Sequence, residues 1–332
     1  MRRREFVALL GGSVAWPLAA RTQQPVEALA GAGSRGFDAR ITPARHDLAA
    51  KHLAGVVEAQ RFVDGTAYEI GTSQAPLRSA PSPEAALLTE ALKGEQVTIY
   101  DISEEGWAWG QLAADGYVGF VPASALCASG PAATHKVTAL RTFVFPGPSI
   151  KLPPTEALSF GCRLVIADIN EPFAITASGG YVPNVHLAPV ETIETDFVAV
   201  AEQFLRTPYL WGGKTGLGID CSGLLQHALA ACGIPCPRDS DMQEEALGSA
   251  LAHPHELKEW RRGDLVFWKG HVAIVRDEAM LVHANAHHMA VAYEATAPAV
   301  ARLRTEGNEV TSVRRLPAPP RRGHTTLDRS RP

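Results

Sequence analysis

Short hydrophobic segments that alternate with polar residues and turn signals fill residues 67–190. In the first half these runs are 97–100, 107–111 and 117–121, and in the second half they are 164–167, 173–175 and 179–183. Short strands at this spacing predict small closed β-barrels. The endings DGYVGFVPASAL and GGYVPNVHLAPV align with each other. We therefore expect two diverged copies of one barrel, at 67–128 and 133–190.

The pattern becomes helical near residue 195. Apolar residues recur at offsets of 3, 4 and 7 from Phe197, and Asp196 precedes them as a helix cap. Strand-like runs then follow at 264–268, 271–275 and 281–284. Helices followed by an antiparallel sheet predict an α+β domain over residues 195–317.

The two ends of the chain differ from this body. Residues 1–25 have the basic and apolar layout of an export signal, and Arg3-Arg4 indicates the twin-arginine type. Residues 26–66 are expected to be a Gly-rich linker followed by a short helix near 47–53. The Pro- and Arg-rich tail, 318–332, is expected to be disordered.

Composition and charge limit the classes of function. The chain is 46% hydrophobic and 20% charged, which is typical of a soluble globular protein. No apolar run long enough to span a membrane follows residue 25, so no stable membrane insertion is expected after signal removal. The formal net charge is −4, and both ends are basic, so the body is more acidic than the total. An acidic body repels phosphate backbones, and we expect no nucleic-acid partner.

Five cysteines are present, and an odd number leaves at least one of them unpaired. No CxxC spacing indicates a zinc site. Cys232 and Cys236 are interpreted as small buried residues, and no role is assigned to Cys127 or Cys162.

Cys221 carries the clearest candidate chemistry. Glycines interrupt the chain before Asp220, and an apolar helix begins just after Cys221. Unpaired N–H groups and the helix dipole at such a position favour the thiolate that a nucleophile needs. The same N–H groups can receive the oxyanion of an acyl-transfer intermediate. We therefore predict that Cys221 is a nucleophile.

A nucleophilic cysteine needs a general base, and the base needs an orienting partner. The strands on either side of residues 276–278 predict a hairpin. A three-residue turn would pair residue 275 with 279 and His271 with His283, which sets both imidazoles on one sheet face. A turn with an even number of residues would put them on opposite faces.

Residues 196–317 resemble the NlpC/P60 cysteine peptidases, papain-like enzymes that cut bacterial cell-wall peptides. The matching segments are PYLWGG, DCSG, GDLVFW, GHVAIV and the later histidine. The resemblance implies Cys221 as nucleophile, His271 as base and His283 as its orienter, without a metal or other cofactor. The two barrels resemble bacterial SH3 domains. Together, the domains are most similar to γ-D-glutamyl-L-diamino acid endopeptidases, which need a free N-terminal L-Ala-γ-D-Glu.

The resemblance also implies a set of substrate-binding residues. They are Tyr209, Trp211, Asp220, Ser222, Asp239, Ser240 and, from the first barrel, Tyr117. Asp239 would pair with the ammonium of L-Ala, Ser240 would bond the D-Glu portion, and Tyr209 would also help hold the oxyanion. From the residues alone, two alternatives stay open: Asp239 and Ser240 could cap the helix that follows, and Tyr117 could belong to the barrel core.

The same residues also suit other functions. Cys221, His271, His283 and the pair His287-His288 could ligate zinc, although structural sites usually take two ligands from one short turn. A papain-like amidase or acyltransferase, or a non-catalytic wall-binding SH3 protein, would also suit parts of the chain. We expect export to the periplasm, with cytoplasmic recycling of murein peptides as the alternative, and the oligomeric state stays open.

Overall fold

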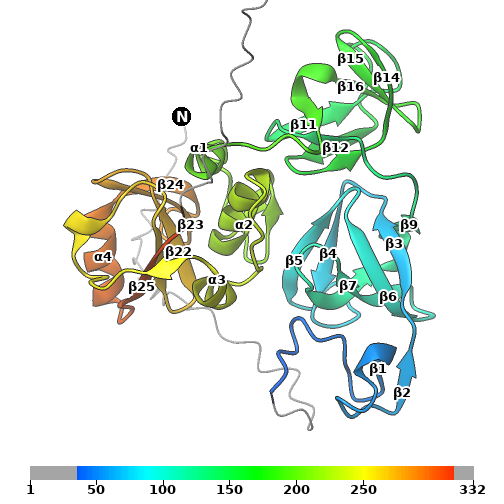
Figure 1. The fold of residues 1–332 in the computed structure, drawn as a ribbon. Coiled ribbons are helices and arrows are strands. Elements are labelled where there is room, and N and C mark those ends of the chain that lie inside the picture. The colour runs from blue at the N-terminus through cyan, green and yellow to red at the C-terminus, as the bar shows by residue number, and fades with distance from the viewer. Residues whose placement is uncertain (1–35, 318–332) are drawn as a thin grey trace, which may run out of the picture.

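The computed structural model describes residues 36–317, which form an N-terminal arm, two β-barrels and a mixed α/β domain (Figure 1). The predicted signal peptide, most of the linker and the predicted tail from residue 318 lie outside the described residues and stay predictions. Among the described residues, no helix is long and apolar enough to cross a membrane.

The arm, residues 36–63, is extended and does not contain the α-helix expected near residue 47. Leu48–Ala50 (β1) instead pairs in parallel with Arg61–Val63 (β2), and Lys51–Leu53 forms a single 3-10 turn. Leu48 is fully buried against Trp109 and Val118 of the first barrel. The prediction was wrong because this tertiary contact outweighs the weak local preference for helix.

The first barrel is one seven-stranded antiparallel sheet with an apolar interior. In sheet order its strands are β5 (Leu87–Leu92), β4 (Gln74–Arg78), β8 (Val118–Pro122), β7 (Trp107–Leu112), β6 (Gln96–Ile102), β3 (Thr66–Ile70) and β9 (Leu126–Ala128). Strands β7 and β8 meet at the predicted turn, where Asp115 Oδ1 accepts the Tyr117 N–H at 3.0 Å. This turn brings Tyr117 to one end of the barrel.

The second barrel is built from three smaller sheets. Its strands are β10 (His135–Val137), β11 (Arg141–Val144), β12 (Glu156–Ser159), β13 (Arg163–Leu164), β14 (Ile166–Asn170), β15 (Phe173–Thr176), β16 (Tyr181–Pro183) and β17 (Leu187–Pro189). The two aligned endings fold alike: in each, a strand ends at proline, a 3-10 turn follows and a last strand begins.

The C-terminal domain is an antiparallel six-stranded sheet with helices on both faces, and its helices and antiparallel sheet confirm the predicted α+β class. The strands in sheet order are β20 (Ser249–Ala250), β25 (Val310–Arg315), β21 (Leu265–Trp268), β22 (His271–Val275), β23 (Met280–Asn285) and β24 (Ala290–Ala295). The remaining elements are α1 (Phe197–Glu202), the hairpin β18 (Lys214–Thr215) and β19 (Gly218–Ile219), α2 (Cys221–Ala231), α3 (Ser240–Ala246) and α4 (Thr296–Thr305).

Both faces of this sheet are apolar, and this places α2 and α4 on opposite sides. Val272 and Ile274 of β22 pack in the cluster that contains α1 and α2. Ala273 and Val275, which alternate with them, pack in the cluster that contains α4. The alternation follows from the period of two in a strand, and it seats the start of α2 against β22.

The hairpin between β22 and β23 differs from the predicted register. Val275 pairs with Leu281, so five residues separate the paired positions instead of three. The turn is larger because Asp277 Oδ1 accepts the Ala279 N–H at 2.9 Å and the Met280 carbonyl accepts the Arg276 N–H at 2.9 Å. Five is still an odd number, so the two histidines stay on one face.

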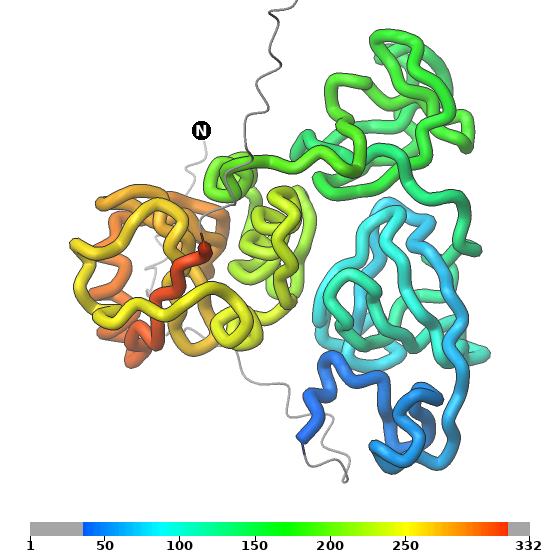
Figure 2. Tube along the Cα trace, in the orientation of Figure 1, coloured from blue at the N-terminus to red at the C-terminus, as the bar shows by residue number. Residues whose placement is uncertain are grey.

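The first barrel is attached directly to the C-terminal domain, although 85 residues of sequence separate β9 from β18. Glu90 of β5 accepts the backbone N–H of Lys214 at 2.7 Å, and the Lys214 ammonium bonds Glu95 at 3.0 Å. The tube in Figure 2 shows the arm running beneath this barrel toward the C-terminal domain. The two domains therefore meet close to the start of α2.

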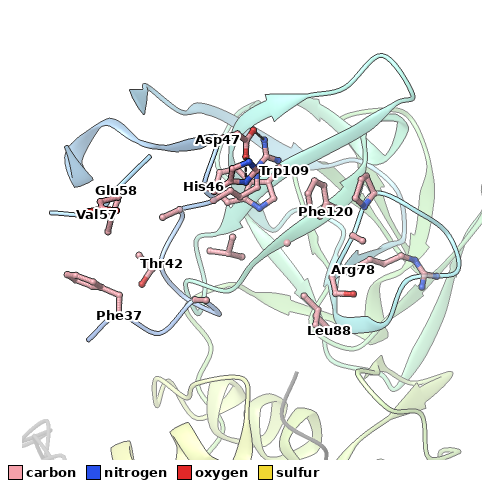
Figure 3. Close-up of a pocket in the computed structure, with 18 residues that line it drawn as sticks. Phe37, Thr42, His46, Asp47, Val57, Glu58, Arg78, Leu88, Trp109 and Phe120 are labelled. Carbon is pink, nitrogen blue, oxygen red and sulfur yellow. Dashed lines mark hydrogen bonds and ion pairs between the residues drawn. The ribbon is translucent and has the colours of Figure 1, made fainter. Parts of the chain in front are cut away.

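A cavity of about 390 Å³ lies between the arm and the first barrel (Figure 3). Thr42 and Val57 of the arm line one side, and Trp109 and Phe120 of the barrel line the other. None of the predicted site residues lines this cavity. It is therefore separate from the arrangement described next.

Candidate active site

Cys221 is the first residue of α2, where the local sequence enforces a sharp entry into the helix. Asp220 precedes it as the N-cap and accepts the Gly223 N–H on Oδ1 at 2.7 Å. A side chain at residue 223 would lie 2.6 Å from the Gly213 carbonyl, so glycine is required there. This close packing fixes the thiol at the helix start.

The thiol environment differs from the prediction of a preformed thiolate. Burial raises the pKa of Cys221 to about 12, and the Asp220 carboxylate acts in the same direction. The N–H of Val272, the Arg238 guanidinium and the Ser222 N–H oppose these effects without reversing them. Desolvation therefore outweighs the helix terminus, and the resting thiol is neutral. Its proton must be removed by a base during attack.

The two histidines are brought together with a carboxylate that the sequence analysis did not identify. His271 Nε2 lies 2.9 Å from His283 Nδ1, and His283 Nε2 lies 3.0 Å from Glu294 Oε2. Arg302 donates to Glu294 at 3.0 and 3.1 Å. His271 is next to Val272, whose N–H faces the thiol. The contacts thus run from His271, next to the strand residue that faces the thiol, to a half-buried ion pair.

These contacts assign the proton positions. Burial tends to raise the pKa of Glu294, but hydrogen bonds from His283 and Arg302 lower it to about 2, so it is a pure acceptor. His283 must then carry hydrogen on Nε2 and present a lone pair on Nδ1. That lone pair accepts Nε2–H of His271, which leaves Nδ1 of His271 as the free base. Burial, and next the neighbouring His283, lower the pKa of His271 well below its ordinary value, so the base is neutral at pH 7.

Glu294 and Arg302 were not predicted from the sequence, because only strand pairing and helix docking bring them to the site. Ala292 of β24 pairs with His283, and Glu294 lies two residues further on the same face. Arg302 comes from α4. The signal in the sequence was a single charged residue inside the apolar strand AVAYEA.

Glu294→Gln is expected to lower kcat/KM about 10-fold, the low end for losing a charged partner that orients a histidine. The amide keeps the size of the side chain but can also donate, so His283 is no longer held in one tautomer. Steady-state kinetics at pH 7 measure the effect. Glu306→Gln is the matched control because Glu306 also bonds Arg302, at 3.3 Å, away from the histidines. Equal losses in both variants would show that Glu294 acts only through Arg302.

Asp220 and Ser222 are committed to a buried guanidinium. Arg238 is 1% exposed and donates to Asp220 at 2.8 and 2.9 Å and to Ser222 Oγ at 2.7 Å. Its Nε donates at 2.7 Å to Thr89 of the first barrel. Both side chains thus support the helix start and the domain contact. The contact of either with a peptide stays a prediction.

Asp239 faces the first barrel at the start of α3. Its side chain does not cap this helix, and its Oδ2 accepts the Tyr117 hydroxyl at 2.9 Å. Tyr117 is 3% exposed, with its ring in the barrel core and its hydroxyl at Asp239. Both sequence interpretations of Tyr117 therefore describe part of its position. Ser240 follows as the buried first residue of α3.

Tyr209 and Trp211 lie on the loop before the nucleophile. Burial raises the pKa of Tyr209, and the nearby Cys221 adds to the shift, so the phenol stays protonated close to the thiol. A protonated hydroxyl here can donate to an oxyanion. The Trp211 side chain is 43% exposed, as a pocket-lining residue in an open site can be.

The other candidate residues, for metal binding and for cysteine chemistry, do not lie together. Within residues 36–317, no group of three or more His, Cys, Asp or Glu side chains is arranged to hold a metal ion. The five cysteines are all free, and Cys232 and Cys236 are partly buried. Cys127 is exposed and Cys162 is buried.

Residues 206–305 match the NlpC/P60 family, and residues 77–126 match the bacterial dipeptidyl-peptidase SH3 domain. Dipeptidyl-peptidase 6 of Lysinibacillus sphaericus is 34% identical over 100 residues, which are 30% of this chain and 35% of that protein. A γ-D-glutamyl-L-lysine dipeptidyl-peptidase of Bacillus cereus is 27% identical over 229 residues, or 59% of this chain and 67% of that protein. The alignment thus spans about a third of the first relative's length.

A solved structure of an NlpC/P60 family protein from Bacillus cereus shares the fold. Its TM-score is 0.62 at 22% identity, and the match covers 76% of this chain and all of that one. The fold and the family matches agree with the predicted α+β domain behind an SH3-like barrel. Residues 206–305 therefore match the NlpC/P60 family and residues 77–126 match a bacterial SH3 domain, as the sequence resemblance predicted.

Proposed function

We propose that this chain hydrolyses the γ-D-Glu–L-diamino acid bond of murein-derived peptides that have a free N-terminal L-Ala. One observation carries the proposal: Asp239, in the same domain as the nucleophile, accepts the hydroxyl of Tyr117 from the first barrel at 2.9 Å. A carboxylate enclosed by two domains can recognise the ammonium that ends such a peptide. The names of two relatives, both γ-D-glutamyl-L-lysine dipeptidyl-peptidases, support the same class of substrate.

The geometry supports acyl transfer through a thioester. The Cys221 thiol attacks the γ-carbonyl carbon of D-Glu while Nδ1 of His271 takes its proton. The oxyanion accepts hydrogen bonds from the N–H at the start of α2 and from the Tyr209 hydroxyl. When the C–N bond breaks, His271 returns the proton to the leaving amine. Water, deprotonated by the same nitrogen, then hydrolyses the thioester and frees the thiol.

His283 and Glu294 act on the charge that forms on His271. A neutral His271 gains a proton during attack, and the Nδ1 lone pair of His283 then accepts a charge-assisted bond. Glu294 holds this acceptor in place at 3.0 Å. The arrangement stabilises the imidazolium in the transition state more than the neutral ring in the resting enzyme, which is how such a contact accelerates the reaction.

Asp239→Asn is expected to raise KM for L-Ala-γ-D-Glu-diaminopimelate by about 10- to 100-fold with little change in kcat. Truncating one partner of a buried charge pair costs about 2–5 kcal/mol. The carboxylate is 21% exposed, so we expect the low end. Initial rates over a range of substrate concentrations give both constants. The N-acetylated peptide is the control, and a KM that rises equally for both peptides would contradict recognition of the ammonium.

A further inference from the structure

Arg40 of the arm reaches the Asp239 end of the site from a backbone that is tied to the first barrel. Its carbonyl accepts the Val118 N–H at 2.8 Å, and the carbonyl of the next residue, Ile41, accepts Gln111 Nε2 at 2.8 Å. Val118 follows Tyr117 directly. The arm therefore delivers Arg40 beside the hydroxyl that bonds Asp239.

The Arg40 guanidinium uses all five of its N–H donors on carboxylates. Nε and one Nη2 hydrogen bond Asp38, at 3.0 and 2.7 Å. The other Nη2 hydrogen and one Nη1 hydrogen bond the two oxygens of Asp241, both at 2.8 Å. The last donor, on Nη1, bonds Asp239 Oδ2 at 2.9 Å. Because arginine has five such donors and no acceptor, none is left for a substrate carboxylate.

Because all its donors are already bonded, Arg40 is a fixed part of the site and not a side chain that a ligand would displace. A ligand that displaced Arg40 from its place would break bonds to three carboxylates at once. Tyr117 and Arg40 both bond Oδ2 of Asp239, so neither competes with a ligand for Oδ1. Three carboxylates around one guanidinium also leave an excess of negative charge, which attracts a cation.

We propose that Arg40 is a positioning residue, which holds the Asp239 carboxylate in place for the ammonium of the substrate. The inference rests on the proposed function and adds a residue from outside both matched domains. Burial raises the pKa of Asp239, and the charges of Arg238 and Arg40 and the Tyr117 hydrogen bond oppose this. Arg40 thus helps to keep Asp239 ionised as well as oriented.

Arg40→Ala in the full chain is expected to raise KM for the free-amine peptide about 10-fold, with kcat within about 2-fold of wild type. The N-acetylated peptide should be affected little. Arg40→Lys should recover part of the loss, because lysine keeps the charge but has three donors in place of five. Lys51→Ala is the matched control: Lys51 lies on the same arm in an exposed pair with Asp64, at 2.6 Å.

Three outcomes would overturn the inference. An unchanged KM would show that Asp239 needs no support from the arm. A lower KM would make Arg40 a competitor of the substrate ammonium. An equal loss of kcat/KM for both peptides, with no rescue by lysine, would show a general role in folding. If the wild-type chain cleaves neither peptide, the proposed function fails and this inference fails with it, whereas any of the first three outcomes in an active enzyme leaves that function standing.

Discussion

Replacing Cys221 by alanine is expected to lower kcat at least ~10³-fold, the scale for a nucleophile that acts as a unit with its base. The thiol supplies the atom that bonds the acyl group, and no neighbouring side chain can replace it. The helix should persist because Asp220, not Cys221, caps its start. Loss of the buried sulfur should destabilise the fold by about 1 kcal/mol, which is typical of a point substitution.

Peptide hydrolysis and the melting temperature should be measured on the same preparation. Cys127→Ala is the control, since Cys127 is an exposed free thiol of the first barrel. The control should keep wild-type activity, and the Cys221 variant should melt as a folded protein. Activity near the wild-type level in the Cys221 variant would rule out the thioester mechanism.

His271→Ala is expected to cost nearly as much, about 10³-fold in kcat/KM. Burial raises the pKa of Cys221 to about 12, so the thiol does not ionise unaided at pH 7. The base is therefore needed in the attack itself, and again to protonate the leaving amine. The thiol is neutral in the resting enzyme. A variant without His271 therefore has no ready-made thiolate that could sustain the reaction.

Steady-state kinetics at pH 7 and at pH 9 test this role. His288→Ala is the matched control, because that imidazole lies near His283 but bonds Asn285, at 2.9 Å, and not His271. Activity of the His271 variant should rise with pH as hydroxide ionises more thiol. A loss smaller than 10-fold at pH 7 would place the general base elsewhere.

The local pattern of apolar and polar residues predicted most of the architecture. The strands β6, β7 and β8 follow alternation with a clear turn between β7 and β8. The two histidines share a sheet face because the turn between their strands has five residues in place of the predicted three, and both numbers are odd. The exact register failed because Asp277 enlarges that turn through its own side chain, an effect that apolar periodicity does not report.

What the sequence did not reveal depends on partners distant in the chain. The segment Leu48–Ala50 becomes a strand because Leu48 finds Trp109, and Arg40 meets Asp239 across 199 positions. The state of Cys221 was mispredicted for a related reason. A helix start is visible in the sequence, but the burial that dominates its pKa is a property of the packed domain.

The division of labour between Arg238, Arg40 and the catalytic residues has an evolutionary consequence. Arg238 joins Thr89 of the barrel to Asp220 of the peptidase domain, while Arg40 and Tyr117 approach Asp239 from the N-terminal half. If Asp239 binds the peptide end as proposed, substitutions in the arm and barrel can alter which peptide end is accepted without changing Cys221 or His271. Under the proposed function, selection on substrate range and selection on chemistry then act on separate segments of one gene, so substrate preference can change through the arm and the first barrel alone.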